Sequence, residues 1–438
     1  MKQKYLLLFL ICSYWVYSQE NDLPYQIKKV INRYKDTMHI GVEIVSIQNR
    51  DVIYSKNAHH LFTPASATKI IIAAAALDIL GLNSRFATKM GYQGTLQNNQ
   101  LHGDVYIKGC GDPTFSIDNI VQFFKKLQIT TVHGGIYIDN SVFKPSLFAH
   151  GFLLENVEVP QFYTPVAPLM LDGKAYDVCI QETDHSYSLT CHYNLDRLQK
   201  VLHENGIQIM GGCGLDFKEF PDKNYTYIYH ESEPLIQLIK HMLKTSNNIY
   251  ADCICRALGN RLGRNDSELY SGSTWNKSIA TIKKFLAKKV GIPKDEIVIS
   301  DGSGMSRFNM ISPQHINQVL YWILKQTYAL DFVNALPNAG VDGTLKKRLT
   351  EYPNQIQAKT GTLNGVSALC GYILDTQSVF KYIFSIIING FVQKSLLPEL
   401  EPTEYTQGLS NPKAEIEDAI CKILLKNLPC QNYLNDSF

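Results

Sequence analysis

The 438-residue sequence lacks the features that mark disordered, membrane-spanning or nucleic-acid-binding proteins. Lysine and arginine (42) nearly balance aspartate and glutamate (40), so the chain has no excess of positive charge to neutralise phosphates. Beyond the N-terminus, the longest apolar runs, 70–76 and 382–389, fall well short of the ~20 residues that cross a bilayer. The 45% hydrophobic and 11% aromatic content is typical of globular proteins. We therefore expect a folded protein with no nucleic-acid partner and no membrane span in the mature chain.

Motifs for metal, nucleotide and common hydrolase sites are also missing. The chain has no Cys-x-x-Cys pair, His-Glu-x-x-His, Gly-x-Ser-x-Gly, Walker-type phosphate loop or Gly-x-Gly-x-x-Gly. We therefore expect neither a metal site nor an organic cofactor. Ten cysteines are present, and nine remain after Cys12 of the N-terminal segment is set aside, so at least one thiol is free or intermolecular. Cys253 and Cys255 are not expected to bridge, because residues two apart on a helix point in different directions.

The N-terminus predicts a secretory signal peptide. A basic start precedes an apolar run over residues 5–12, and Ser18 offers a small residue for cleavage. A signal peptide over residues 1–18 removes two lysines and leaves 40 charges of each sign. A lipoprotein signal ending at Cys12 is the alternative, although Ile11 is a poor residue before a lipidated cysteine. The mature protein is expected to be secreted across the cytoplasmic membrane and to act in the periplasm or cell envelope.

The middle of the chain differs in pattern from its ends. Residues 86–229 are mainly short β runs separated by Gly, Asn, Asp and Pro turns, and we interpret them as a β-rich insertion. Residues 19–85 and 230–438 combine apolar helices with alternating strands, and we assign both to one catalytic domain. Its predicted elements are helices at 23–34, 64–80, 234–243, 249–261, 274–290, 313–325 and 413–426, and strands at 38–47, 51–55, 356–359, 366–374 and 380–391. This order predicts an α/β sandwich whose antiparallel sheet, flanked by helices, is assembled from both ends of the chain.

A serine and a lysine three residues apart are the first candidates for chemistry. Ser66 and Lys69 share one face at the start of the apolar helix predicted over 64–80. Ser-x-x-Lys occurs four times in the chain, but only Ser66 opens a long helix, where amide groups and the helix dipole favour negative charge. From these residues alone, a helix-capping serine and a nucleophile remain equally good interpretations.

Two further polar segments accompany this pair. Lys244-Thr245-Ser246-Asn247-Asn248 occupies the gap between two predicted helices, where a hydroxyl and a carboxamide can reach the same site; a helix-capping loop is the alternative. Lys359-Thr360-Gly361-Thr362 follows a short predicted strand and combines a cation, two hydroxyls and a glycine that lets a ligand approach the backbone. No other Lys-Thr-Gly occurs in the chain.

The order Ser-x-x-Lys, Ser-x-Asn, Lys-Thr-Gly is the set found in penicillin-binding proteins and serine β-lactamases. The chain resembles D-alanyl-D-alanine carboxypeptidases of the penicillin-binding protein 4 type, peptidase family S13. Gly-Cys-Gly-Asp-Pro-Thr at 109–114, Asp-Gly-Ser-Gly-Met-Ser-Arg at 301–307 and Gly-Val-Asp-Gly-Thr at 340–344 add to the resemblance. Ser246 follows Ser66 by 180 positions, which leaves room for an inserted module. The resemblance implies the penicillin-binding protein fold, which is also that of serine β-lactamases.

The resemblance implies a catalytic role for the first two segments. Ser66 is the expected nucleophile and Lys69 its base, with burial and the neighbouring Lys359 lowering the pKa of Lys69. Ser246 and Asn248 are expected to complete the proton network and to bind the substrate amide, with Ser246 passing a proton to the leaving amine.

The third segment is implied to bind substrate. Lys359, Thr360 and Thr362 are expected to hold the terminal carboxylate through charge-assisted hydrogen bonds, and Gly361 belongs to the same binding segment. The backbone N–H groups of Ser66 and Thr362 are expected to form the oxyanion hole.

Together these features predict a serine D-Ala-D-Ala carboxypeptidase that cleaves peptidoglycan stem peptides through an acyl-enzyme at Ser66. Endopeptidase cleavage of cross-links is a further expected reaction, and β-lactams are expected inhibitors. A serine β-lactamase or D-amino-acid esterase is the alternative among enzymes, and a non-catalytic β-lactam sensor is the alternative outside them.

Overall fold

The computed structural model describes residues 22–143, 149–151, 165–173, 177–183, 186–192, 195–221, 223–260, 273–391 and 412–428. The predicted signal peptide lies outside the described residues. Contacts divide the chain into two compact units. The first comprises Met1–Ile70, Leu243–Ser246 and Met310–Phe438, and the second comprises Ile71–Met242 and Asn247–Asn309. The domain limits predicted from the sequence, 85/86 and 229/230, stay predictions.

A five-stranded antiparallel sheet forms the centre of the first unit. Its strands, in spatial order, are β12 (Ile356–Leu363), β13 (Val366–Leu374), β14 (Phe380–Asn389), β1 (His39–Ser46) and β2 (Val52–Lys56). Strand β1 from the start of the chain pairs along its whole length with β14 from the end. The prediction that both ends of the chain build one sheet is therefore confirmed.

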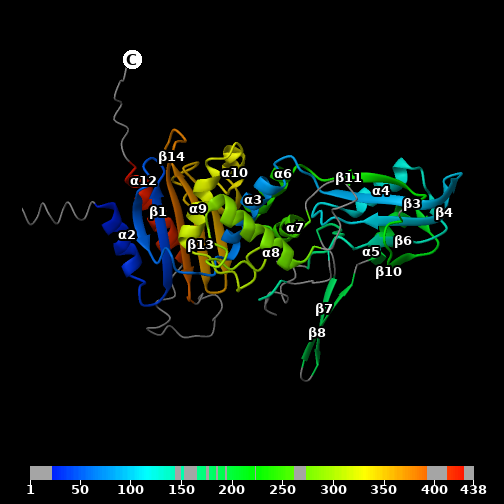
Figure 1. Ribbon diagram of the computed structural model, residues 1–438, viewed down its shortest axis with the longest axis horizontal. Helices are drawn as coiled ribbons and strands as arrows, with labels where there is room; N and C mark the ends of the chain where they lie inside the picture. Colours follow the sequence, from blue (N-terminus) through cyan, green and yellow to red (C-terminus); the bar gives the residue numbers. More distant parts are fainter. Residues whose placement is uncertain are drawn as a thin grey trace, which may run out of the picture. The chain divides into compact units, whose positions relative to one another are not determined.

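Helices cover both faces of this sheet (Figure 1). The alternation of side chains along β14 shows why: Phe384, Ile386 and Ile388 join the apolar cluster of α2 (Leu23–Asn32) and α12 (Ala419–Lys426). Between them, Ser385 points to the opposite face and donates a hydrogen bond to Asn317 of α9 (Pro313–Ile323) at 2.7 Å. Strand β13 is buried on both faces. The result is a three-layer arrangement, with the sheet as the middle layer and β12 as one of its edge strands.

Short helical segments complete the first unit. They are the 3₁₀ turns η1 (Ala65–Ala67) and η4 (Gly343–Leu345), the helix α10 (Ala329–Ala335) and the π turn η6 (Lys413–Asp418). The predicted C-terminal helix over 413–426 is therefore a π turn followed by α12. The helix α10 was missed, because its seven residues give too short a pattern to separate it from a loop.

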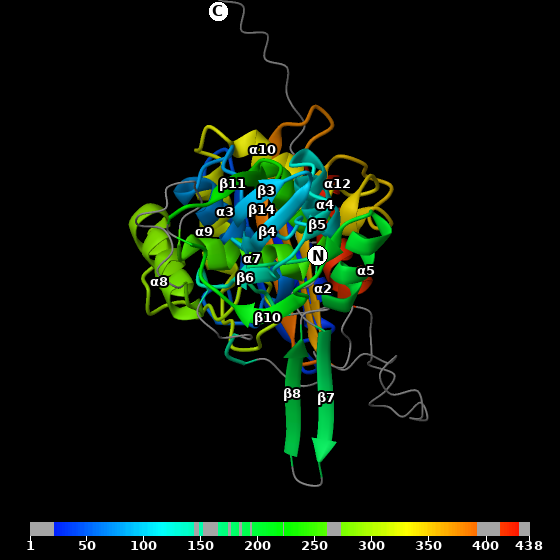
Figure 2. The same ribbon diagram turned by 90° about the vertical axis from the view of Figure 1, so that its right-hand side faces the viewer.

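The second unit contains a seven-stranded sheet with the main order β10-β6-β4-β3-β11. The strands are β3 (Ala87–Gln97), β4 (Gln100–Lys108), β5 (Thr131–Val132), β6 (Ile136–Asp139), β9 (Gln208–Ile209), β10 (Cys213–Phe217) and β11 (Thr226–Glu231). Figure 2 shows β7 (Asp177–Thr183) and β8 (Ser186–His192) as a separate antiparallel hairpin. The helices that lie wholly in the second unit are α4 (Ile117–Lys126), α5 (Leu195–Glu204), α7 (Asn248–Leu258) and α8 (Trp275–Phe285). Helix α8 continues into the short π-helix η3 (Leu286–Val290).

Two helices have residues in both units: α3 (Thr68–Ile79) and α6 (Leu235–Thr245). Helix α3 follows η1 directly and is apolar on all sides, with Ile70 to Ala76 fully buried. A helix that is hydrophobic all round has to be buried in a core. Among the described residues, no helix is both long and apolar enough to span a bilayer.

Candidate active site

Ser66 and Lys69 lie within hydrogen-bonding distance of each other. Lys69 Nζ is 2.8 Å from Ser66 Oγ and donates to it. The predicted helix over 64–80 begins differently than expected: Ser66 is the middle residue of the 3₁₀ turn η1, and the α-helix starts at Thr68. Lys69 follows Ser66 by three residues, so the two side chains lie on one side of the helix that begins here. Ser66 is half-buried and Lys69 is fully buried, so the amine lies beneath the hydroxyl.

The residue before Ser66 has an unfavourable backbone conformation. Ala65 has φ of 48°, in the left-handed region that residues with a Cβ rarely adopt. Such conformations persist only where the surrounding structure imposes them, and they cluster at functional sites. Nothing in the sequence around Ala65 signals this conformation.

Ser246 occupies the break between two helices, as predicted. Helix α6 ends at Thr245 and α7 begins at Asn248. Ser246 also has a positive φ, 59°, and it is half-buried. Asn247 is the N-cap of α7, and its side chain accepts a hydrogen bond from Tyr250 N at 3.1 Å. Asn248 belongs to the second unit, and its position in the site stays a prediction.

Strand β12 carries the third segment. The predicted strand over 356–359 was too short, since β12 runs to Leu363 and includes all of Lys359 to Thr362. Lys359 is fully buried, and its Nζ donates to Ser246 Oγ and to Thr360 O, each at 2.8 Å. Two buried amines therefore each contact one half-buried serine hydroxyl, Lys69 with Ser66 and Lys359 with Ser246.

Electrostatics couples the two amines. Burial, and after it the positive charge of Lys69, lower the pKa of Lys359 well below its ordinary value. Cys370 on the neighbouring strand has a weaker, opposing influence on the pKa of Lys359. The two positive charges repel each other, so a proton on Lys69 disfavours a proton on Lys359.

Gly361 allows the first segment to lie against β12. A Cβ at this position would be 2.7 Å from Pro64 O, closer than real Cβ atoms come to other atoms, and 3.2 Å from Ala65 Cβ, which is a tight contact. The absence of a side chain therefore brings η1 and the strand together at this point. A turn was the simpler interpretation of this glycine from the sequence, but Gly361 lies inside a regular strand.

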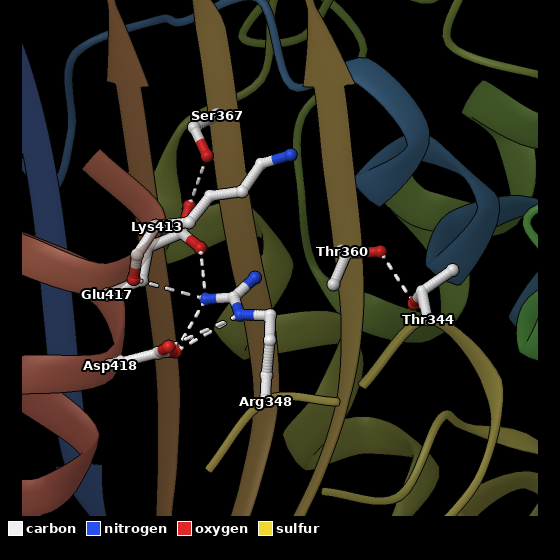
Figure 3. A network of polar contacts seen from close by, with 7 residues as sticks. All are labelled: Thr344, Arg348, Thr360, Ser367, Lys413, Glu417 and Asp418. Atoms are coloured by element: carbon white, nitrogen blue, oxygen red, sulfur yellow. Dashed lines mark hydrogen bonds and ion pairs between the residues drawn. The ribbon is translucent and has the colours of Figure 1, made fainter. Parts of the chain in front are cut away.

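The backbone of β12 presents polar groups at the edge of the sheet. Ala358 N donates to Pro337 O at 3.0 Å, so its N–H points away from β13. Alternate residues of a strand point the same way, which directs the N–H groups of Thr360 and Thr362 to that edge as well. The side chain of Thr362 is exposed and that of Thr360 is half-buried. Thr360 Oγ1 lies 2.7 Å from Thr344 Oγ1 (Figure 3).

A largely buried ionic network joins the neighbouring strand β13 to η6 (Figure 3). Ser367, opposite Thr362 in the strand register, donates to Glu417 Oε1 at 2.6 Å. Arg348 Nη2 donates to Glu417 at 2.8 Å and to Asp418 at 2.6 Å. Burial raises the pKa of Glu417, and the charge of Arg348 opposes that rise. Sequence analysis missed this network because its members are dozens of residues apart.

Two acidic residues, in the segments 109–114 and 301–307 that add to the family resemblance, have structural roles. Asp112 Oδ1 accepts hydrogen bonds from the backbone and the hydroxyl of Thr114, at 2.8 and 2.6 Å. Asp301 accepts hydrogen bonds from Gly304 N, Ser306 N and the side chains of Ser303 and Asn309. Both carboxylates therefore stabilise their own loops in the second unit.

The cysteine side chains that the structure describes are buried, free thiols. Cys110, Cys253, Cys255, Cys370 and Cys421 are buried and free, which confirms that Cys253 and Cys255 do not bridge. Burial raises the pKa of Cys110 and of Cys370 to about 12. Among the described residues, no three His, Cys, Asp or Glu side chains come together in a way that could hold a metal ion.

Comparisons with known proteins show to which family the chain is similar. The model of the D-Ala-D-Ala carboxypeptidase 3 (S13) family matches residues 25–186 and 188–403. The D-alanyl-D-alanine carboxypeptidase DacB of Haemophilus influenzae is 25% identical over 420 residues, covering 81% of this chain and 86% of that protein. The crystal structure of penicillin binding protein 4 from the same organism aligns with a TM-score of 0.73 at 22% identity, covering 91% and 98% of the two chains. Its complex with a β-lactam aligns with a TM-score of 0.70 at 22% identity, over the same shares of the two chains.

The structural match shows that the fold is shared: an α/β fold of the penicillin-binding protein and β-lactamase type with an antiparallel sheet and an additional β-rich part. The family match spans most of the chain, including all three polar segments. The chain therefore belongs to the D-Ala-D-Ala carboxypeptidase 3 (S13) family and is a serine D-Ala-D-Ala carboxypeptidase of the penicillin-binding protein 4 type.

Proposed function

We propose that Ser66 is the nucleophile of this carboxypeptidase and that Lys69 is its base. The observation that carries the proposal is the 2.8 Å separation of Lys69 Nζ and Ser66 Oγ at the start of a buried helix. A serine hydroxyl is a weak nucleophile unless a base within hydrogen-bond reach takes its proton. The bond that forms joins Ser66 Oγ to the carbonyl carbon of the penultimate D-alanine, and the proton moves from Oγ to Nζ.

The coupled amines supply this base near neutral pH. With one proton shared between Lys69 and Lys359, one of the two nitrogens is neutral, and a neutral Lys69 can accept the proton of Ser66. A substrate carboxylate close to Lys359 favours the state in which Lys359 holds the shared proton. Substrate binding therefore promotes the protonation state that the reaction needs.

The oxyanion of the tetrahedral intermediate is stabilised by backbone N–H groups of Ser66 and Thr362. Ser66 lies in the first turn of a helix, where amide groups and the dipole favour negative charge. The N–H of Thr362 points to the edge of the sheet, and Gly361, the residue before it, lets η1 lie against the same strand. One such donor contributes about 2.7 to 4 kcal/mol to transition-state stabilisation.

The terminal carboxylate of the substrate is held by the hydroxyls of Thr360 and Thr362 together with the charge of Lys359. Thr360 and Thr362 reach the surface, whereas Lys359 is fully buried, so the lysine acts through its field and through Ser246. Hydroxyl donors next to a buried cation form charge-assisted hydrogen bonds with a carboxylate. This binding site explains why the enzyme cleaves next to a free C-terminal D-alanine.

Ser246 returns the proton to the leaving group. Its hydroxyl accepts a hydrogen bond from Lys359 and can donate to the amine of the departing D-alanine as the C–N bond breaks. Asn248 binds the amide of the substrate. Lys359 replaces the proton that Ser246 gives up, and the proton that Lys69 took from Ser66 passes on to Lys359, so Lys69 is neutral again. Water then attacks the ester at Ser66, Lys69 takes the proton of that water, and Lys69 returns it to Ser66 Oγ as the ester C–O bond breaks, which restores the free enzyme.

The substrate is the D-Ala-D-Ala end of peptidoglycan stem peptides, and the enzyme works outside the cytoplasmic membrane. The expected signal peptide over residues 1–18 and the membership in the family support this placement. β-Lactams mimic the D-Ala-D-Ala end and acylate Ser66, as the β-lactam complex of the Haemophilus influenzae protein suggests by analogy. Endopeptidase cleavage of cross-links uses the same acyl-enzyme with a different leaving amine.

Incubation of the protein with purified muropeptides and with fluorescent penicillin tests the proposal. We expect release of D-alanine and one covalent label, both abolished in Ser66→Ala. Ser378→Ala is the matched control, because Ser378 and Lys381 have the same spacing, but Ser378 lies in the loop before β14 and Lys381 lies in β14. Labelling that persists in Ser66→Ala would show that another residue is the nucleophile. Rapid loss of the penicillin label without D-alanine release would instead identify a β-lactamase. Stable labelling without D-alanine release would identify a β-lactam sensor.

A further inference from the structure

An ion pair lies two residues before Ser246. Lys244 is in the last turn of α6, and its Nζ is 2.7 Å from both carboxylate oxygens of Asp342. Asp342 is the N-cap of η4, and its Oδ1 also accepts a hydrogen bond from Asn338 N at 3.0 Å. The two charged residues are 98 positions apart in the chain. The pair therefore fastens the end of α6 to the loop around η4.

The main chains of these two segments are also in direct contact. A Cβ on Gly343 would lie 2.8 Å from Lys244 O, and Gly343 has φ of 60°. Only a glycine at this position allows the loop to approach the carbonyl of Lys244 so closely. The ion pair and this backbone contact both join the last turn of α6, just before Ser246, to the loop around η4.

The same loop is attached to β12. We call residues 337–345 the bracing segment. Ala339 N donates to Ile356 O, and Ala358 N donates to Pro337 O, each at 3.0 Å. At its other end, Thr344 Oγ1 lies 2.7 Å from Thr360 Oγ1 (Figure 3). The bracing segment thus connects the strand that carries Lys359 to the loop that carries Ser246.

Ser246 needs such a connection. Its φ of 59° is unfavourable for a residue with a side chain, so an unrestrained loop would relax to another conformation. Relaxation would carry Ser246 Oγ away from Lys359 Nζ, which is 2.8 Å from it in the structure. A displacement of about 1 Å in a catalytic group can reduce a rate about 100-fold.

We propose that the Lys244–Asp342 ion pair is a positioning device that keeps Ser246 within reach of Lys359 during acylation. This inference rests on the proposed role of Ser246 in proton transfer. Neither Lys244 nor Asp342 touches the reacting atoms, so both are positioning residues. The pair is partly exposed, with side-chain exposures of 15% and 44%, and such pairs contribute little to folding stability. Its removal should therefore reduce catalysis much more than stability.

The test uses the full chain and four variants: Lys244→Met, Asp342→Asn, the double variant, and Lys244→Arg. The acylation rate with fluorescent penicillin, kcat and KM for D-alanine release, and the thermal unfolding midpoint are measured for each. We expect each single charge-removing variant to lower the acylation rate and kcat about 10- to 100-fold with a smaller change in KM. The double variant should be no slower than either single variant, because both remove the same interaction. Lys244→Arg should retain most of the rate.

Lys381→Met is the matched control. Lys381 pairs with Asp375 at 3.0 Å in the same unit, with exposures of 16% and 14%, and has no connection to Ser246. Its acylation rate should stay within about twofold of the wild type. Wild-type rates in folded Lys244→Met and Asp342→Asn would overturn the inference, as would losses that multiply in the double variant. If the wild-type protein neither labels nor releases D-alanine, the proposed function itself is wrong.

Discussion

Gly361→Ala tests whether close contact between β12 and the turn carrying Ser66 is needed for acylation. The new Cβ would lie 2.7 Å from Pro64 O, about 0.7 Å inside ordinary contact distance, and 3.1 Å from Ala368 Cβ. Because Pro64 O is backbone and Ala368 lies in a buried strand, neither can move aside as a flexible side chain would. The turn must therefore shift away from β12, and Ser66, two residues after Pro64, shifts with it.

The expected cost has two parts. Overpacking at a buried position costs about 1 to 3 kcal/mol of stability. A shift of roughly half an ångström between Ser66 and the N–H of Thr362 should slow acylation about 10- to 30-fold, given that about 1 Å can cost 100-fold. That factor corresponds to about 1.4 to 2 kcal/mol in the activation free energy.

Time-resolved labelling with fluorescent penicillin measures this rate, and thermal unfolding gives the folded fraction. Ile373→Val is the control, since Ile373 lies in the apolar cluster on the other face of the sheet and its truncation costs about 0.5 to 1.5 kcal/mol without touching Ser66. We expect the control to label at the wild-type rate. A folded Gly361→Ala protein that labels equally fast, or a control that slows as much, would refute the steric argument.

Two further variants test the buried charges. Because the unfolded chain binds a proton on Lys359 more readily than the folded protein does, the stability of wild type relative to Lys359→Met should rise with pH from the lowered pKa up to about 10.4. Urea unfolding at several pH values measures this difference, and a difference that does not change with pH would contradict it. Arg348→Met should lower the free energy of unfolding by about 3 to 5 kcal/mol, because it leaves the fully buried Glu417 without its cation. The Arg348→Met/Glu417→Gln double variant should regain part of the lost stability. If the double variant and Arg348→Met are equally destabilised, the result would argue against the ion pair.

Much of the sheet could be predicted from the sequence, because its apolar pattern is regular. The limits of β13 were predicted without error, and β1 was predicted to within one residue at each end. The run from Val366 to Leu374 is buried on both faces and bounded by turns, which leaves little ambiguity. The ends of β12 were harder, since Thr360 and Thr362 are polar and Gly361 is a poor strand former by itself.

Among the polar contacts of the site, those between residues close in sequence could be predicted from spacing and the long-range ones could not. The contact between Ser66 and Lys69 follows from helix periodicity, since three residues bring both side chains to one face. The contact between Lys359 and Ser246 spans 113 residues, and only the order of the motifs in the family pointed to it. The Lys244–Asp342 pair spans 98 residues, and without that guide it was missed. Local geometry can be predicted from spacing, whereas long-range pairing depends on the tertiary fold.

The features that no local rule predicts are also those that cost stability. Ala65 and Ser246 have left-handed backbone conformations, and Lys359 is an amine buried with a second amine nearby. Each of the two backbone conformations costs on the order of 1 to 3 kcal/mol. All three lie against a sheet whose central strands are buried on both faces, so the surrounding packing can hold them in place. In the proposed mechanism, the strained turn positions Ser66 and one of the buried amines accepts its proton. Variants that relieve either constraint should therefore be more stable and less active than the wild type.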